Sequence, residues 1–337
     1  MNKRSFLLLA GAVVLALCTF LLTCTPDGPD NPSGTEPPKT PVLEIPVFNA
    51  DSAYNYIAQQ VAFGPRVLGS AGHEATQEWL TAELKKTGDR VLVQDFIANV
   101  YTGDKFPAAN LIAQFNPDVS DRILLAAHWD TRHVADSPLN KERVEEPILG
   151  ADDGGSGVGV LLEIARILKA HPIGLGVDII LFDAEDYGDS SGETQDSYCL
   201  GSQYWGRNPH SPYKARYGIL LDMVGAKDAK FLVDGISAQI NPQLVRKVWT
   251  LASRMGKSNY FIQQNGPGIT DDHFYVTKFG GVPMIDIINL AGAGGETAFG
   301  DHWHTHNDDM DIIDKNTLRA VGQVLLAAIY REDAGTF

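Results

Sequence analysis

The chain has 337 residues, of which 44% are hydrophobic and 20% are charged, an ordinary composition for a globular protein. Its formal net charge is −15, and its sequence pI is about 4.9. A nucleic-acid-binding protein needs a basic surface to neutralise phosphate groups, so no nucleic-acid partner is expected. Without its N-terminal segment the chain keeps about 285 residues, enough for one large domain with a substantial core.

The N-terminal residues 1–24 have the pattern of an export signal. Lys3 and Arg4 precede an almost wholly apolar run over residues 5–22, as in a signal peptide. Cys24 follows this run in a setting that resembles a loose bacterial lipoprotein cleavage box, which would make it the lipidated first residue. Because the run approaches membrane-spanning length, an uncleaved signal anchor is the alternative. In a bacterium, either interpretation predicts an exported, periplasmic protein that is anchored to the membrane.

Residues 25–45 are rich in Pro, Gly, Thr and Asp and are expected to form a flexible tether. A single catalytic domain is expected over residues 46–337, because no repeat and no second linker interrupts them. Cys199 is the one cysteine of this domain, so no internal disulfide is expected. We interpret it as a small buried residue rather than a nucleophile, because its sequence neighbours offer no adjacent base.

The remaining pattern alternates between strands and helices in chain order. Asp51 or Ser52 is expected to cap the first helix. The predicted sheet is mixed and mostly parallel, with helices on both faces, which gives a single-domain three-layer α/β/α fold. Helices are predicted over residues 51–62, 70–86, 156–168, 243–255 and 315–330, and strands over 90–96, 110–115, 122–127, 177–182, 217–221 and 282–288.

Three of the apolar strands end directly at polar residues that can bind metal. The first ends at His128, the second at the segment 183–186 and the third at Asp222. Ligands in such sheets bind beyond the carboxyl ends of the strands. The sequence therefore predicts a functional site at this edge of the sheet.

Two further segments add possible ligands to this site. Asp152 and Asp153 lie in a glycine-rich loop before a predicted helix, and His304 lies in a late loop. Zinc prefers imidazole and carboxylate ligands, and a catalytic zinc keeps one position open. The adjacent acids Glu185 and Asp186 point in different directions, so one can bind metal while the other serves as a base. Together these elements predict a metal site.

The ordered motifs His-x-Asp, Asp-x-x-Ser-Gly, Ala-Glu-Asp, Asp-Met and His-Thr resemble the zinc aminopeptidase superfamily called M28. The resemblance extends from about Asp51 to Tyr330. Within the superfamily the chain is similar to the glutaminyl cyclase branch, including its bacterial members. The motifs that carry this second resemblance are the segment 63–70, Asp271-Asp272-His273 and Trp303-His304-Thr305.

The resemblance implies roles for individual residues. Asp153, Asp186 and His304 would bind zinc, and Glu185 would be the general base. Asp152 competes with Asp153, but the register with Ser156-Gly157 favours Asp153. His302 and His306 flank His304, which the Trp-His-Thr context selects. The family often has Glu in place of Asp186. Asp222 and Asp271 would form a hydrogen-bonded catalytic network.

The number of metal ions stays open. A cyclase would hold one Zn2+ per chain, whereas a two-zinc aminopeptidase would recruit His128 and Asp222 for the second ion. Asp130 would orient His128. Trp303 and Phe299 would line the substrate pocket. The pocket Trp that animal cyclases have after the position of Asp186 is missing from the segment 187–192.

The implied activity is an acyl transfer. A peptide or protein with N-terminal glutamine would cyclise to pyroglutamate and release ammonia. The alternative is a two-zinc aminopeptidase that hydrolyses N-terminal residues. A third possibility is a metal-binding module without catalysis, which the intact Glu185 disfavours because such a module has no use for a base.

Overall fold

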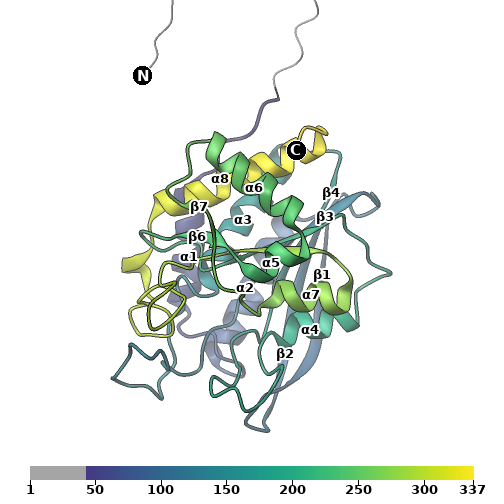
Figure 1. The fold of residues 1–337 in the computed structure, drawn as a ribbon. Coiled ribbons are helices and arrows are strands. Elements are labelled where there is room, and N and C mark those ends of the chain that lie inside the picture. Colours follow the sequence, from purple (N-terminus) through teal and green to yellow (C-terminus); the bar gives the residue numbers. More distant parts are fainter. Residues whose placement is uncertain (1–42) are drawn as a thin grey trace, which may run out of the picture. The chain divides into compact units, whose positions relative to one another are not determined.

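The computed structural model describes residues 43–337, which form one unit (Figure 1). The predicted signal over residues 1–24 and most of the predicted tether lie outside the described residues. Within the described part of the chain, no helix combines the length and the apolar character needed to cross a bilayer.

The centre of the fold is a six-stranded sheet in the order β1-β2-β4-β3-β5-β8. Strands β4, β3, β5 and β8 are parallel to one another, whereas β2 is antiparallel to both β1 and β4. The predicted mixed, mostly parallel sheet is therefore confirmed. The strands are β1 (Arg90–Asn99), β2 (Lys105–Phe115), β3 (Arg122–His128), β4 (Gly176–Phe182), β5 (Gly218–Asp222) and β8 (Met284–Ile288).

Helices cover both faces of this sheet. One face packs on α1 (Ala50–Ala62), α2 (Ala71–Thr87), α3 (Gly155–Ala170), α6 (Pro242–Arg254) and α8 (Lys315–Asp333). The other face packs on α4 (Leu200–Arg207) and α7 (Asp272–Gly280). Strands β3 and β4 are buried along their whole length, because helices cover both sides of them. The predicted three-layer α/β/α architecture is thus confirmed.

Several short elements did not emerge from the sequence pattern. They are α4, α5 (Gly235–Ile240), α7, the strands β6 (Phe231–Val233) and β7 (Phe261–Asn265), and the 3-10 turn η1 (Met310–Ile312). The predicted cap of the first helix is wrong by two or three residues. Asn49 is the cap, and its side chain accepts hydrogen bonds from the backbone N–H groups of Asp51 and Ser52.

Parallel strands bring their carboxyl ends to one edge of the sheet. His128 is the last residue of β3 and Asp222 is the last residue of β5, and the two strands are hydrogen-bonded neighbours. On the other side of β3, strand β4 ends one residue before Asp183. The fold thus delivers the polar residues that follow these strands to one place.

Candidate metal centre

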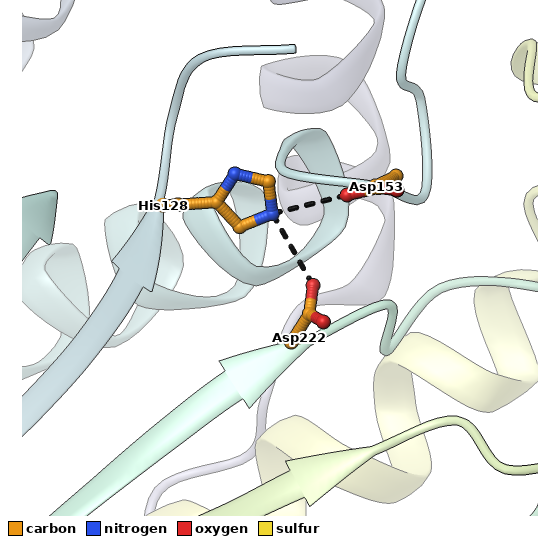
Figure 2. Close-up of side chains that lie close together, drawn as sticks. All are labelled: His128, Asp153 and Asp222. Carbon is orange, nitrogen blue, oxygen red and sulfur yellow. Dashed lines mark hydrogen bonds and ion pairs between the residues drawn. The ribbon is translucent and has the colours of Figure 1, made fainter. Parts of the chain in front are cut away.

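His128 lies between two carboxylates that come from other elements (Figure 2). Its Nε2 atom is 3.1 Å from Asp153 Oδ1 and 3.3 Å from Asp222 Oδ1. All three side chains are nearly inaccessible, and their ligand atoms lie within 4.8 Å of one another. This group can hold a metal ion.

A second group of the same kind shares Asp153. His304 Nε2 is 3.2 Å from Asp186 Oδ1 and 3.7 Å from Asp153 Oδ2. The structure therefore brings together Asp153, Asp186 and His304, which lie 33 residues or more apart in the sequence. Because Asp153 contributes to both groups, its two oxygens could bridge two metal ions. Alternatively, only one of the two groups could hold an ion.

The glycine-rich loop positions Asp153 at the start of α3. Asp308 accepts hydrogen bonds from the backbone N–H groups of Asp152 (2.7 Å) and Asp153 (3.0 Å), which fixes the loop. Gly154 follows with φ of 82°, and a Cβ atom there would meet the backbone oxygen of Asp130 at 2.6 Å. Glycine is therefore needed for the loop to approach His128 this closely.

The side chain of Asp152 points away from this centre. One of its oxygens accepts hydrogen bonds from the backbone N–H groups of Gly225 and Ala226, and the other lies 2.9 Å from His302 Nε2. The two candidates Asp152 and His302 thus pair with each other. His306 is also outside the centre, with its ring against the backbone oxygen of Arg143.

Asp136 orients His304. Its Oδ1 atom accepts a hydrogen bond from His304 Nδ1 at 2.9 Å, which leaves Nε2 directed at Asp153 and Asp186. Arg132 donates two hydrogen bonds to the same carboxylate and a third to the backbone oxygen of Asp186. Burial opposes a charged carboxylate here, but the hydrogen bonds from His304 and Arg132 outweigh it and lower the pKa of Asp136.

Glu185 is positioned by a short loop with strained backbone geometry. Ala184 before it has a positive φ of 55°, a conformation that costs a non-glycine residue about 1–3 kcal/mol. Asp130 accepts hydrogen bonds at 3.0 Å from the backbone N–H groups of both Glu185 and Asp186. The same carboxylate lies 3.5 Å from His128 Nδ1. Asp130 therefore supports the loop as well as the imidazole that the sequence predicts it to orient.

Cys199 contacts Glu185, which lies 14 residues away in the sequence, although the sequence neighbours of this cysteine offer no base. Its Sγ atom is 3.2 Å from Glu185 Oε1, and its backbone N–H donates to the backbone oxygen of Glu185. Burial is the main cause that raises the pKa of the Cys199 thiol well above its usual range. The thiol therefore acts as a hydrogen-bond donor to the carboxylate and not as a nucleophile, and the residue is buried as predicted.

Asp271 approaches the centre from the N-terminus of α7. Its carboxylate lies within 4.8 Å of Glu185 and Cys199, and one of its oxygens has no hydrogen-bond partner. Burial is the main cause that raises the pKa of Asp222 to about 8; the charges of Asp271 and Asp153 act in the same direction, and the hydrogen bond with His128 opposes them. Within the described residues no direct hydrogen bond joins Asp222 to Asp271; both face the same cavity.

An open cavity of about 170 Å³ lies over the two groups. Trp303 lies flat on His304, with ring centres 3.8 Å apart, and Phe299 packs on Trp303. Tyr198 lines the opposite part of the cavity, although no sequence motif marks it. Tyr187, which follows Asp186, stacks on His133 outside the cavity.

The donor set fits a cation such as zinc. Imidazole nitrogens and carboxylate oxygens are the ligands that zinc prefers. Asp186 Oδ2 is buried without a hydrogen-bond partner in the described structure. Burial opposes a positive charge on His304, yet Asp186 and Asp136 outweigh it and raise the pKa of His304 to about 9. The surrounding carboxylates therefore favour positive charge at this point.

Three residues of the site could not be found from motifs, because Asp136, Asp308 and Tyr198 belong to no ordered pattern in the sequence. Asp136 and Asp308 bind residues more than 150 positions away, and Tyr198 lines the cavity. Asp183 was part of a candidate segment, but it pairs with His73 at 2.9 Å on the far side of the loop. Only their positions in the folded structure distinguish these residues from the many other polar residues in loops.

Comparison with known proteins gives one family match and several close structures. The model of the family described as Peptidase family M28 matches residues 110–329. Glutaminyl cyclase from Porphyromonas gingivalis is 49% identical, with a TM-score of 0.82 over 85% of this chain and 99% of that one. A Zn-dependent exopeptidase from Parabacteroides distasonis is 48% identical, with a TM-score of 0.83 over the same shares.

The more distant relatives include a glutaminyl-peptide cyclotransferase and an aminopeptidase. Glutaminyl-peptide cyclotransferase from Drosophila melanogaster is 24% identical over 277 residues, 75% of this chain and 73% of that protein. Aminopeptidase YwaD from Bacillus subtilis is 29% identical over 225 residues, or 64% of this chain. The chain spans only 41% of the length of that aminopeptidase.

Proposed function

The chain belongs to peptidase family M28, as its motifs predict, and on this premise we propose that it is a zinc-dependent glutaminyl-peptide cyclotransferase. Its substrates would be peptides or proteins that begin with glutamine. The observation that carries the proposal is the 49% identity to a glutaminyl cyclase over nearly all of that protein's length. At this identity, a shared arrangement of the site is the expected outcome.

Asp153, Asp186 and His304 would hold the zinc ion, which supplies Lewis acidity toward the side-chain amide of the substrate glutamine. Asp136 keeps the ring of His304 in the orientation that this requires, because it accepts the hydrogen bond from Nδ1. Arg132 in turn holds Asp136 and the backbone of Asp186.

Glu185 moves the proton in the proposed reaction. The α-amine nitrogen forms a bond to the side-chain amide carbon, and Glu185 accepts the proton that the amine loses. Glu185 then returns a proton to the amide nitrogen, which leaves as ammonia. Burial is the main cause that raises the pKa of Glu185 well above its usual range, and a raised pKa suits a carboxylate that must both accept and release a proton.

The surroundings of Glu185 support this assignment. Asp271 and Asp222 face the same cavity and would steady the proton path. Trp303 and Phe299 form an aromatic wall that excludes water from the reacting atoms. Exclusion of water matters because the reaction consumes none, and hydrolysis would give a different product.

A two-zinc aminopeptidase is the second candidate. The cluster of His128, Asp153 and Asp222 favours it, because these residues could hold a second ion that shares Asp153 with the first (Figure 2). Glu185 would then activate a water molecule instead of an amine.

A comparison of two substrates separates the candidates. The purified full chain is mixed with a glutamine-initiated fluorogenic peptide and, separately, with a leucine anilide. Release of ammonia without cleavage of the peptide bond is expected. Release of leucine would instead favour the aminopeptidase, and inactivity toward both substrates by a zinc-loaded protein would favour a binding module.

Metal analysis gives a second, independent result. About one zinc ion per chain supports the cyclase, whereas about two support the aminopeptidase. The measurement should be repeated with the variant His128→Ala. Loss of one of two ions in that variant, with the other retained, would support the second site.

We further propose that the chain is exported and anchored in a membrane by its first 24 residues, through a lipid on Cys24 or an uncleaved signal anchor. The basic residues and the apolar run before Cys24 support this proposal. Mass spectrometry of the mature N-terminus tests it, since an acylated Cys24 and an intact Met1 have different masses.

A further inference from the structure

A cluster of four cationic side chains lies where α6 meets the end of α8. Arg246, Lys247 and Arg254 are exposed on α6, and Arg331 is half-buried near the end of α8. With Thr250, Leu251, Thr336 and Phe337 they line a shallow pocket of about 250 Å³. We call these four cations the basic patch. Figure 1 shows α6 (green) beside α8 (yellow), next to the C-terminus.

The basic patch has no acidic partners among the described residues. The nearest carboxylates along α8 are engaged elsewhere: Glu332 pairs with Arg216, and Asp333 accepts hydrogen bonds from the backbone N–H groups of Gly174 and Leu175. Arg331 Nε is buried and has no hydrogen-bond partner. Lys247 lies over the ring of Phe337, 5.0 Å from its centre, but none of the four cations has a carboxylate partner in the described part of the chain. Four cations therefore gather on a chain whose net charge is −15, and the remaining attraction of the patch is for an external anion.

The chain enters the domain at this same place. Ile45, two residues after the first described residue, packs against the cluster of Leu251, Ala327 and Ala328, and Phe337 of the pocket packs against the same cluster. Leu43 is partly exposed beside it. The 42 preceding residues are therefore joined to the domain next to the basic patch. The patch is therefore close to the point at which the chain enters the domain.

The basic patch and the metal centre lie toward opposite ends of the sheet. The backbone of Gly174 and Leu175, which Asp333 binds near the patch, leads directly into β4. Glu185 and Asp186 follow the other end of β4. A strand of seven residues spans about 23 Å, so the cavity and the patch are separated by about the length of β4.

We propose that the basic patch docks the domain on the anionic phospholipid headgroups of the membrane that anchors it. Arginine and lysine near such a surface bind its phosphates, and the proximity of the chain's entry point keeps the patch within reach of the bilayer. Docking would turn the cavity toward the aqueous side, where peptides arrive. The proposal rests on the proposed membrane anchor and is independent of the proposed reaction.

The test uses the full chain in phosphatidylcholine vesicles with and without phosphatidylglycerol. An environment-sensitive fluorophore is attached at position 336, in the patch, or at position 141, in a loop near His304. Brominated lipids should quench the probe at position 336 only when phosphatidylglycerol is present. About 1 M salt should abolish this quenching, because the Debye length is then about 3 Å. The probe at position 141 should stay unquenched.

Charge reversal identifies the residues responsible. Each cation near an anionic bilayer favours docking by about fivefold, so the variant Arg246→Glu, Lys247→Glu, Arg254→Glu should shift the docking equilibrium by at least roughly 100-fold. The matched control is Lys105→Glu, Lys141→Glu, Lys227→Glu, three exposed lysines at the end of the molecule that carries the cavity. It should dock like the parent chain. Both variants should keep their turnover of a glutamine-initiated peptide.

Four results would overturn the proposal. The first is equal quenching of both probes, and the second is equal loss of quenching in both variants. The third is protection of the probe at position 336 from an aqueous quencher when the chain is in detergent without vesicles. This result would mean that the chain's own residues 1–42 cover the patch. Failure of the full chain to stay with the vesicles would also overturn it, whether or not the enzyme is active.

Discussion

The position of Glu185 is fixed by three residues that are not neighbours of one another in the sequence. Asp130 binds its backbone N–H, Cys199 donates to its side chain, and Ala184 gives the loop its left-handed turn. A carboxylate that must exchange protons with a substrate gains from such support, because a small displacement costs much of the rate. The residue is thus positioned before any substrate arrives.

The variant Glu185→Gln should retain zinc and lose nearly all turnover. Glutamine has almost the same size as glutamate but cannot accept the proton, and positioned acid–base groups contribute about 10²- to 10⁴-fold. Initial rates on a glutamine-initiated peptide and the zinc content of the same sample are the measurements. Full activity in this variant would remove Glu185 from the mechanism.

Asp136 should support metal affinity, although it is not one of the proposed metal ligands. In Asp136→Ala, His304 loses the partner of Nδ1 and Arg132 loses its paired carboxylate. Loss of such a supporting carboxylate typically weakens metal binding by about 10- to 100-fold. A chelator titration that follows bound zinc measures the effect.

The matched control for this variant is Asp118→Ala. The Asp118 side chain is 95% exposed and makes only a loose ion pair with Arg90. Zinc should leave this control at the same chelator concentration as it leaves the parent chain. Equal zinc loss from Asp136→Ala and the parent would show that Asp136 does not support the site.

At the residue scale the sequence predicts which side chains converge but not what supports them. Asp153, Asp186 and His304 stand in recognisable motifs, and the structure brings their ligand atoms within 4.8 Å. Asp136 and Cys199 carry no such signal, because a supporting contact needs only one polar atom at the right distance. Many sequence contexts provide that atom, so only the fold identifies it.

At the scale of elements, α3 connects the metal-binding loop to the core. The helix is buried almost throughout, and it packs on α1 and on the sheet. Gly157 lets it approach β5, since a Cβ atom there would lie 2.4 Å from the backbone oxygen of Leu221. Leu221 directly precedes Asp222, so this contact sets the position of a site residue.

The variant Gly157→Ala should therefore lower both stability and activity. Alanine normally favours a helix over glycine by about 1 kcal/mol, but overpacking of a tight contact typically costs about 1–3 kcal/mol. We expect a lower free energy of unfolding in urea and a loss of turnover as the end of β5 shifts. Urea titration and steady-state rates are the measurements.

Gly174→Ala is the control for this prediction. A Cβ atom at Gly174 would meet no atom closer than 3.4 Å, and that atom is a carboxylate oxygen of Asp333. Its free energy of unfolding should stay within about 0.5 kcal/mol of the parent. A stable, active Gly157→Ala variant would mean that the contact with Leu221 relaxes freely.

The strands of the central sheet and the long helices were predictable, whereas the short helices α4, α5 and α7 were not. Strands β3, β4 and β5 are mainly apolar because both of their faces are buried, and the buried charges of Arg122 in β3 and Asp178 in β4 pair with each other. Helix α4 has eight residues, two of them glycine, and α7 ends in glycine. In such short segments, tertiary packing decides the structure, as when Trp205 of α4 packs against Phe182.

At the scale of the whole molecule, metal binding should contribute to stability. Asp153, Asp186 and His304 come together only in the folded chain, so an ion held by them stabilises the folded state over the unfolded one. At an ion concentration about 1,000 times Kd this amounts to about 4 kcal/mol.

Removal of zinc by a chelator should therefore lower the Tm by several degrees, and added zinc should restore it. Thermal unfolding followed by circular dichroism is the measurement. The variant Asp153→Asn, which loses a ligand of both groups, should respond far less to either treatment. A Tm that does not change with chelator in the parent chain would argue against zinc at this centre.

The left-handed backbone at Ala184 and Met223 limits how this protein can diverge. Both residues adjoin functional positions at strand ends, and branched side chains are costly in this conformation. In a saturation library selected for activity, glycine and asparagine should be enriched over valine and isoleucine at positions 184 and 223. The backbone geometry, rather than the chemistry of the side chain, would then limit the residues that these two positions accept during evolution.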